Sequence, residues 1–227
     1  MEVPLKVIAH IESDFDSKFG VPRQSGLASS LIARVVFKPE YRTPEAFRGI
    51  EEFSHIWIIW DFSESHKDRW SPTVRPPRLG GNTRVGVFAT RSPFRPNPLG
   101  LSCVKLERIE FDKKDGPVLV ISGADMMNGT PVFDIKPYLP SADSVSGATG
   151  GFSEKNIKKT LQVAWDDTQI ADFPENKKEA LRQVLELDPR PAYQDDPDRI
   201  YGFSFAGYEI SFYVKNDILF VKNIYKI

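Results

Sequence analysis

Two arginines and three prolines share one short loop of this chain. The loop runs from Arg91 to Pro98 with the sequence Arg-Ser-Pro-Phe-Arg-Pro-Asn-Pro, between two strand-like runs. Each proline fixes φ, removes a backbone donor and favours extended geometry in the residue before it, so we expect a rigid loop. The loop presents Arg91 and Arg95, whose guanidinium groups suit a carboxylate or a phosphate. The alternative is an ordinary surface connection.

The same loop lies inside a stretch without acidic residues. Between Arg69 and Leu106 there is no Asp or Glu, although the chain carries 31 of them at a net charge of -1. Such a local positive field favours a phosphate, a carboxylate or an RNA backbone. A solvated surface whose arginines pair with carboxylates from elsewhere is the alternative. The arginines of the stretch are at positions 69, 75, 78, 84, 91 and 95.

Several familiar sites are not indicated. No Gly-x-Gly-x-x-Gly follows a predicted strand, so the dinucleotide crevice of a doubly wound sheet is not expected. The three histidines, His10, His55 and His66, lack metal spacing, and we expect no metal. Cys103 is the only cysteine, which excludes an intrachain disulfide. Without a segment of transmembrane length, we expect a soluble, cytoplasmic protein.

The elements around these residues predict a mainly β fold. Short strands joined by turns, with hardly any helix, are typical of a closed or nearly closed β-barrel. The run from Phe53 to Phe62 is almost continuously apolar and predicts a strand buried on both faces. Thr43 is expected to cap a short helix, and Asn128-Gly129 predicts a tight hairpin turn. The expected strands are 3–12, 31–38, 53–62, 101–111, 118–124 and 131–138.

A change of composition marks a second domain. Residues 141–153 are rich in Ser, Gly and Ala, which is typical of a linker, so we divide the chain into a barrel domain, 1–145, and a smaller C-terminal α+β domain, 154–227. In the second domain we expect a helix over 174–187, capped by Asp172. Apolar and polar residues alternate after Tyr208, so we expect the tail to form an antiparallel sheet with this helix covering one face.

Longer motifs resemble a known family. The run Gly86-Val-Phe-Ala-Thr-Arg-Ser-Pro-Phe-Arg-Pro-Asn97 is similar to the signature of the TsaA-like family, and the whole chain resembles its bacterial TrmO-type members. The resemblance implies a β-barrel, not a Rossmann sheet, that binds S-adenosylmethionine near a homodimer interface. It also implies methylation of N6 of threonylcarbamoyl-adenosine, just 3′ of the anticodon in tRNA. The other matching segments are 21–24, 53–55, 70–82, 129–140 and 188–193.

The resemblance also implies a set of donor-binding residues. A guanidinium suits the carboxylate of the donor, an aliphatic side chain its adenine, and a carboxylate its ribose hydroxyls or sulfonium. Ser63 departs from the pattern, because many relatives have histidine there, but a backbone contact would survive the change. The implied residues are Pro22, Arg23, Gln24, Ser63, Glu64, Arg91, Leu101, Asp134, Ile135, Lys136 and Pro137.

For the chemistry we expect direct in-line transfer, with a base that takes the proton of the urea-like nitrogen. Asp134 is the first candidate, and Asp188 with Arg190 and Tyr193 is the second. Phosphates of tRNA are expected to lie along the arginine-rich surface, with Tyr193 near the modified base. Two other functions stay open: a noncatalytic RNA-binding or regulatory module that holds a nucleotide-like ligand, and a methyltransferase with another acceptor. The expected phosphate contacts are Arg69, Arg75, Arg78, Arg95 and Arg190.

Overall fold

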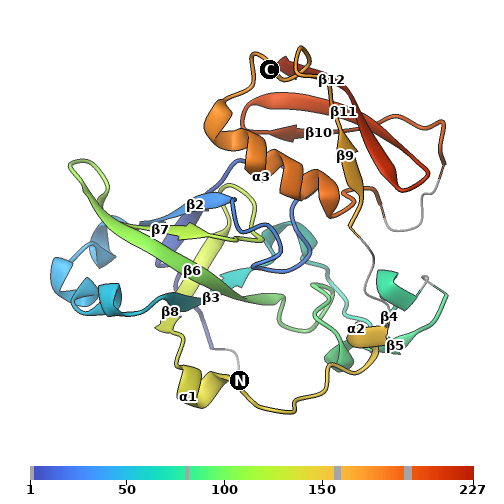
Figure 1. Cartoon of the computed structure of the whole chain (residues 1–227). Coiled ribbons are helices and arrows are strands. Elements are labelled where there is room, and N and C mark those ends of the chain that lie inside the picture. Colours follow the sequence, from blue (N-terminus) through green and yellow to red (C-terminus); the bar gives the residue numbers. More distant parts are fainter. Residues whose placement is uncertain (1–2, 80–81, 156–159, 192–195) are drawn as a thin grey trace.

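The computed structural model describes residues 3–79, 82–155, 160–191 and 196–227 (Figure 1). The mainly β prediction is confirmed, and none of the described helices is long and apolar enough to cross a membrane. The strands are β1 Ala9–Glu12, β2 Ile32–Phe37, β3 His55–Asp61, β4 Thr73–Val74, β5 Val85–Gly86, β6 Leu99–Asp112, β7 Gly116–Ser122, β8 Pro131–Pro137, β9 Gln162–Ala164, β10 Tyr201–Phe205, β11 Tyr208–Lys215 and β12 Ile218–Lys226. The α-helices are α1 Pro140–Asp143, α2 Phe152–Lys155 and α3 Glu175–Glu186, and short 3-10 turns fill the connections.

Six strands close into a barrel in the order β1-β2-β7-β6-β3-β8, and every pair is antiparallel. Strand β3 is buried on one face only, which corrects the expectation from its apolar run. Ile56, Ile58 and Trp60 point into the core, whereas Trp57 and Ile59 on the other face are half-buried. The outer face of β3 is therefore available to a ligand or to another chain.

The predicted hairpin at Asn128-Gly129 is wrong. Of the two residues only Gly129 has a positive φ, and the turn closes through the N–H of Thr130 and the carbonyl of Met127, 3.3 Å apart. A single positive φ at the third residue is the geometry of a type II turn, not of the I′ turn that joins paired strands. The turn instead leads from β7 to β8, which are not neighbours in the barrel.

Three smaller expectations also need correction. The first strand begins at Ala9 rather than near Val3. Thr43 precedes a 3-10 turn, Pro44–Phe47, and makes no side-chain capping bond. Helix α3 is preceded by Pro174 at its N-cap, so Asp172 is not the cap. In the last two cases proline sets the start of the helix through its fixed φ, without a side-chain acceptor.

The C-terminal sheet has the order β10-β11-β12-β9 and is mixed, because β9 runs parallel to β12. The antiparallel pairing expected for the tail is confirmed for β11 and β12, and the structure adds β10 as an antiparallel neighbour and β9 as a parallel one. Asn216 and Asp217 both have positive φ, +51° and +61°, and form the tight turn between β11 and β12. Helix α3 buries the four residues expected to form its apolar face, and these are Ala180, Leu181, Val184 and Leu185.

The C-terminal core also contains residues from the beginning of the chain. Phe15, Ala28 and Leu31, which connect β1 to β2, are buried in one cluster with the apolar residues of α3, β10, β11 and β12. Hydrogen bonds reinforce this contact, since Gln183 of α3 bonds both the backbone N–H and the hydroxyl of Ser30, at 2.9 and 3.0 Å. The segment 15–31, which we call the connecting segment, therefore belongs structurally to both halves of the molecule.

Gly20 in the connecting segment provides a test of this contact. It has φ +89°, and a Cβ there would lie 2.5 Å from the ring of Phe203. We expect Gly20→Ala to lower the free energy of unfolding by about 2–5 kcal/mol, from the left-handed backbone and overpacking together. Gly49, with φ +87° and open space around it, is the matched control. Gly49→Ala should cost only about 1 kcal/mol in urea unfolding, and equal losses would contradict the packing argument.

Candidate functional site

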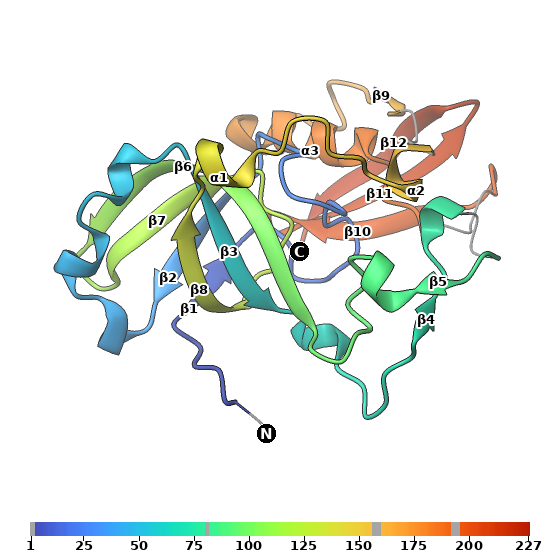
Figure 2. The same cartoon turned by 90° about the horizontal axis from the view of Figure 1, so that it is seen from below.

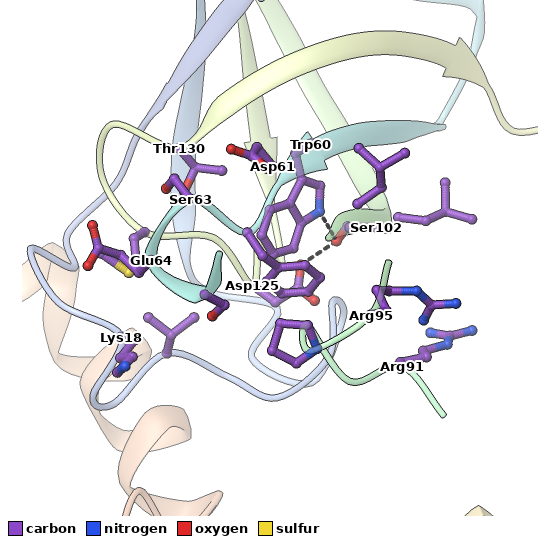
Figure 3. A pocket seen from close by; sticks show the side chains of 18 of the residues that line it. Lys18, Trp60, Asp61, Ser63, Glu64, Arg91, Arg95, Ser102, Asp125 and Thr130 are labelled. Atoms are coloured by element: carbon purple, nitrogen blue, oxygen red, sulfur yellow. Dashed lines mark hydrogen bonds between the residues drawn. The ribbon is translucent and has the colours of Figure 1, made fainter. Parts of the chain in front are cut away.

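A pocket of about 830 Å³ lies where the ends of β3 and β6 meet three loops (Figure 3). Its floor is formed by inward-facing barrel residues, and its walls come from the connecting segment, from residues after β3 and from the proline-rich loop. The volume is within the range of small-molecule and cofactor sites. The lining residues used below are Lys18, Pro22, Arg23, Gln24, Trp60, Asp61, Ser63, Glu64, Phe88, Arg91, Arg95, Leu99, Gly100, Leu101, Ser102 and Asp125.

The two arginines of the proline-rich loop have different partners. Arg91 is exposed and donates to the side-chain oxygen of Gln24 in the connecting segment. Arg95 donates to the carbonyl of Thr90, 3.1 Å away, and so braces its own loop. Both still line the pocket, together with Arg23. The rim is therefore positively charged at three points, which favours an anionic group of a ligand.

A hydrogen-bonded relay, Trp60, Ser102 and Asp125, crosses the floor of the pocket, as the dashed lines of Figure 3 show. The indole N–H of Trp60 donates to the hydroxyl of Ser102 at 2.9 Å, and that hydroxyl donates to Oδ1 of Asp125 at 2.6 Å. With Asp125 ionised the direction is fixed, because an indole nitrogen can only donate and a carboxylate can only accept. Gly100 makes room for the ring, since a Cβ there would lie 2.1 Å from it.

Burial raises the pKa of Asp125 above its ordinary value, because desolvation disfavours the charged form. The bond from Ser102, backbone N–H groups of Asp125 and Ser25, and the charge of Arg91 oppose this shift in part. Two other carboxylates line the pocket. Asp61 lies 2.8 Å from the ring of His66, and Glu64 is exposed on the turn after β3. Asp125 is thus a part-buried carboxylate on the floor of the pocket with a raised pKa.

The structure brings together seven of the expected donor-binding residues, and four lie elsewhere. The four are consecutive on β8, Asp134 to Pro137, and do not line the pocket. Asp134 is half-exposed and lies 2.8 Å from the ammonium of Lys136. It is aligned with Ile59 of β3, which is aligned with Leu101 of β6, so the three share the outer face of the barrel. The seven pocket residues are Pro22, Arg23, Gln24, Ser63, Glu64, Arg91 and Leu101.

The second candidate base, Asp188, is buried and paired with Arg190. Nε and Nη2 of Arg190 donate to the two oxygens of Asp188 at 2.7 and 3.0 Å, and the arginine side chain is only 10% exposed. Asp188 and Arg190 are therefore bonded to each other, and the guanidinium group of Arg190 is too buried to present much charge to a phosphate. The carbonyl of Arg190 accepts from Arg23, 3.5 Å away. Tyr193 and the side chain of Arg78 lie outside the described part of the chain.

The arginines expected to contact RNA lie beside exposed aromatic rings. Arg69 and Arg75 are exposed. Trp70 lies between them in the sequence and is 52% exposed, and Phe88 lies after them and is 73% exposed. The rings of Trp70 and Phe88 lie 6.2 Å apart, and Phe88 also lines the pocket. In Figure 2, β4 and β5 pair as a two-stranded ribbon that lies apart from the barrel strands. Cations and exposed rings thus occur on one surface at the mouth of the pocket.

Sequence reasoning missed the relay and Lys18. Asp125 follows the apolar strand β7 by three residues, and this position after a buried strand is the signal that could have drawn attention to it. Ser102 had no local signal, since its role depends on partners 42 and 23 residues away. Within the described residues, no group of three or more His, Cys, Asp or Glu side chains is placed to hold a metal ion.

The barrel and its pocket define a mainly β protein with a cofactor-sized pocket at the end of the barrel, lined by arginines that suit an anionic group. Two family models match the chain, the tRNA-methyltransferase O N-terminal domain over residues 10–144 and the TrmO C-terminal domain over residues 158–227. The chain belongs to the tRNA-methyltransferase O family.

Curated relatives and a solved structure agree with this assignment. A tRNA (adenine(37)-N6)-methyltransferase of Escherichia coli is 42% identical over 82% of each chain. One of Eikenella corrodens is 46% identical over 76% of this chain and 97% of its own. A putative S-adenosylmethionine-dependent methyltransferase of Pseudomonas aeruginosa is 37% identical over 96% and 95%. The crystal structure of TrmO from Pseudomonas aeruginosa superposes with a TM-score of 0.79 at 30% identity, covering 99% of this chain and all of that one.

Proposed function

We propose that this chain transfers a methyl group from S-adenosylmethionine to N6 of threonylcarbamoyl-adenosine next to the anticodon of tRNA. Membership of the tRNA-methyltransferase O family carries the proposal, and curated relatives are named as tRNA (adenine(37)-N6)-methyltransferases. The threonylcarbamoyl group is the more specific part of the proposal, and it rests on the resemblance of the sequence motifs to those of the family. The donor supplies an electrophilic methyl group, and the chain supplies binding, alignment and a proton acceptor.

The pocket residues fit this donor. Arg23 and Arg91 at the rim suit its carboxylate, and the exposed side chains of Leu99 and Leu101 suit its adenine. A part-buried carboxylate, Asp125, lies on the floor, where a cationic group would offset the cost of its desolvation. The pocket therefore provides opposite charges at its two ends, as a zwitterionic ligand requires. Ser63 also lines the pocket, and we propose that its backbone or its hydroxyl contacts the donor.

The domain division, 1–145 and 154–227, is part of the proposal, with the donor bound in the barrel and the C-terminal domain contacting tRNA. The connecting segment supports a joint role. It carries Pro22, Arg23 and Gln24 into the pocket while Phe15 and Leu31 are buried in the C-terminal core. The C-terminal domain therefore holds one wall of the donor pocket, so its removal should weaken donor binding even without tRNA.

We also propose a homodimer in which a second copy completes the donor site. Asp134 and Lys136 lie on the outer face of the barrel, and Asp134 is two strands from Leu101, or about 10 Å at the usual strand spacing. That face carries exposed Leu99, Leu101 and Leu139, as expected of a surface covered by a partner. Residues of β8 can then approach the pocket of the other copy, which explains why they are absent from the pocket of one chain.

A transfer assay tests the proposed function. Labelled donor is incubated with the protein and with tRNA that carries or lacks the threonylcarbamoyl group. We expect label in the first tRNA, on N6 of the modified adenosine by nuclease digestion and mass spectrometry, and little in the second. Donor bound without transfer to either tRNA would favour the noncatalytic module. Transfer to protein or to small molecules alone would favour a different acceptor.

Charge reversal tests the tRNA surface. Arg69→Glu with Arg75→Glu should weaken tRNA binding and reduce the dependence of log affinity on log salt by about 2, roughly one for each phosphate that is no longer neutralised. Arg48→Glu is the matched control, because Arg48 is exposed on a turn outside the acid-free stretch. The tRNA affinity is measured from about 50 to about 200 mM salt. Equal affinities of the double variant and the control would contradict the assignment of this surface to tRNA.

Complementation tests the shared donor site. Arg91→Ala and Asp134→Ala should each lose donor binding. If they belong to one site across two copies, an equal mixture of the variants re-forms about a quarter of the sites, because half of the dimers are mixed and one site in each is intact. Calorimetric titration of the mixture after subunit exchange measures this fraction. No recovery would place both residues in one chain or exclude the dimer.

A further inference from the structure

Three carboxylates line the pocket in the described part of the chain, and they differ in how they are held. Asp61 is engaged by the ring of His66, and Glu64 is exposed on the rim. Asp125 lies on the floor, held by the hydroxyl of Ser102 at 2.6 Å. A carboxylate that is to accept a proton during a reaction must be fixed in position and shielded from water. Asp125 is held by the relay and is part-buried, whereas Glu64 is exposed and Asp61 is already engaged by His66.

The hydrogen bonds in the relay run in one direction. Trp60 can only donate and the ionised carboxylate can only accept, so Ser102 accepts from the indole and donates its hydrogen to Oδ1 of Asp125. That oxygen accepts from protein, so a proton arriving from a ligand is expected at the other oxygen, Oδ2. The indole and the serine hydroxyl thus hold the carboxylate without supplying a proton that would neutralise it.

We infer that Asp125 accepts the N6 proton of the adenosine during methyl transfer, and that Ser102 and Trp60 position it. The inference rests on the proposed function. The lone pair of N6 forms the bond to the methyl carbon, the carbon–sulfur bond breaks with its electron pair left on sulfur, and the N6 proton passes to Asp125. A sulfonium cation and a carboxylate anion become a neutral thioether and a neutral acid, and the proton later leaves to solvent.

The environment of Asp125 suits this step. Charges of opposite sign disappear together, and such a change is more favourable in a buried pocket than in water, because the pocket solvates the separated ions poorly. The pKa of Asp125, raised by burial, also brings the carboxyl closer to the operating pH, where a base is most effective. Arg91 is the charged group that opposes this shift, and the other ionisable groups lining the pocket are Lys18, Arg23, Asp61, Glu64 and Arg95.

Kinetics at saturating donor and tRNA test the inference. In the unaltered protein the single-turnover rate should rise with pH through the raised pKa of Asp125, because only the carboxylate can accept the proton. Asp125→Asn should lower the rate by about 10²–10⁴-fold and remove this rise, and Asp125→Glu should recover part of both. Glu107→Gln is the control, since Glu107 also accepts from a serine, Ser122, at 2.6 Å, but on the outside of the barrel away from the pocket. An Asp125→Asn variant with an unchanged rate would overturn the inference.

Binding without tRNA gives a second readout. Affinity for cationic S-adenosylmethionine should increase as pH rises through the pKa of Asp125, whereas affinity for the neutral product S-adenosylhomocysteine should not. Asp125→Asn should abolish this difference while still binding the product, which also shows that the variant is folded. A variant that loses both ligands yet turns over normally at saturation would make Asp125 a binding residue only, against the inference.

Ser102→Ala keeps the test decisive if Asp125→Asn does not fold. Loss of the hydroxyl removes a bond that favours the charged form, so the pKa of Asp125 should rise further and the increase in rate should move to higher pH. An unshifted profile would contradict the positioning role. If the unaltered protein methylates no tRNA, the proposed function fails by itself, and the difference between the two ligands still reports whether Asp125 faces the sulfonium.

Discussion

The contact between Gly20 and Phe203 is the constraint on which the architecture of the site depends. Because Gly20 lacks a side chain, the connecting segment can lie against the C-terminal core, with Phe15 and Leu31 buried in it. Pro22, Arg23 and Gln24 follow directly and form a wall of the pocket. A ligand in the barrel therefore touches residues whose position is set by the C-terminal domain, which couples donor binding to the part of the protein proposed to hold tRNA.

A second close approach, between Trp60 and Gly100, fixes the floor of the pocket. The indole lies against bare backbone and directs its N–H along β6 to Ser102, and from there the bond to Asp125 follows. Burying a carboxylate in this way costs stability, because the charged form loses its hydration. Ionisable groups that are destabilised in this way are concentrated at functional sites, and this is the physical reason to give Asp125 a role beyond packing.

Features set by local sequence could be predicted, and features set by distant partners could not. Helix α3 and the strand around Ile58 follow from local sequence, the first from its apolar face and the second from its continuous apolar run. The partners of β7 and β8, and the parallel edge strand β9, depend on how the barrel and the sheet close, which single-strand patterns do not encode. For the site, the arginine loop was evident from its composition, whereas the position of Asp125 after β7 is a weak signal, and its role depends on a serine 23 residues away.

The distribution of charge over the pocket gives the ligand an orientation. Guanidinium groups of Arg23, Arg91 and Arg95 lie on the rim, and the part-buried carboxylate of Asp125 lies on the floor. A zwitterion whose carboxylate and cation are separated by a few bonds lowers its energy most when the carboxylate faces the rim and the cation faces the floor. That orientation brings the reactive methyl group beside the one lining carboxylate that is held by the relay. Under the proposed function, the rim arginines that bind the donor therefore also determine which carboxylate can accept the proton.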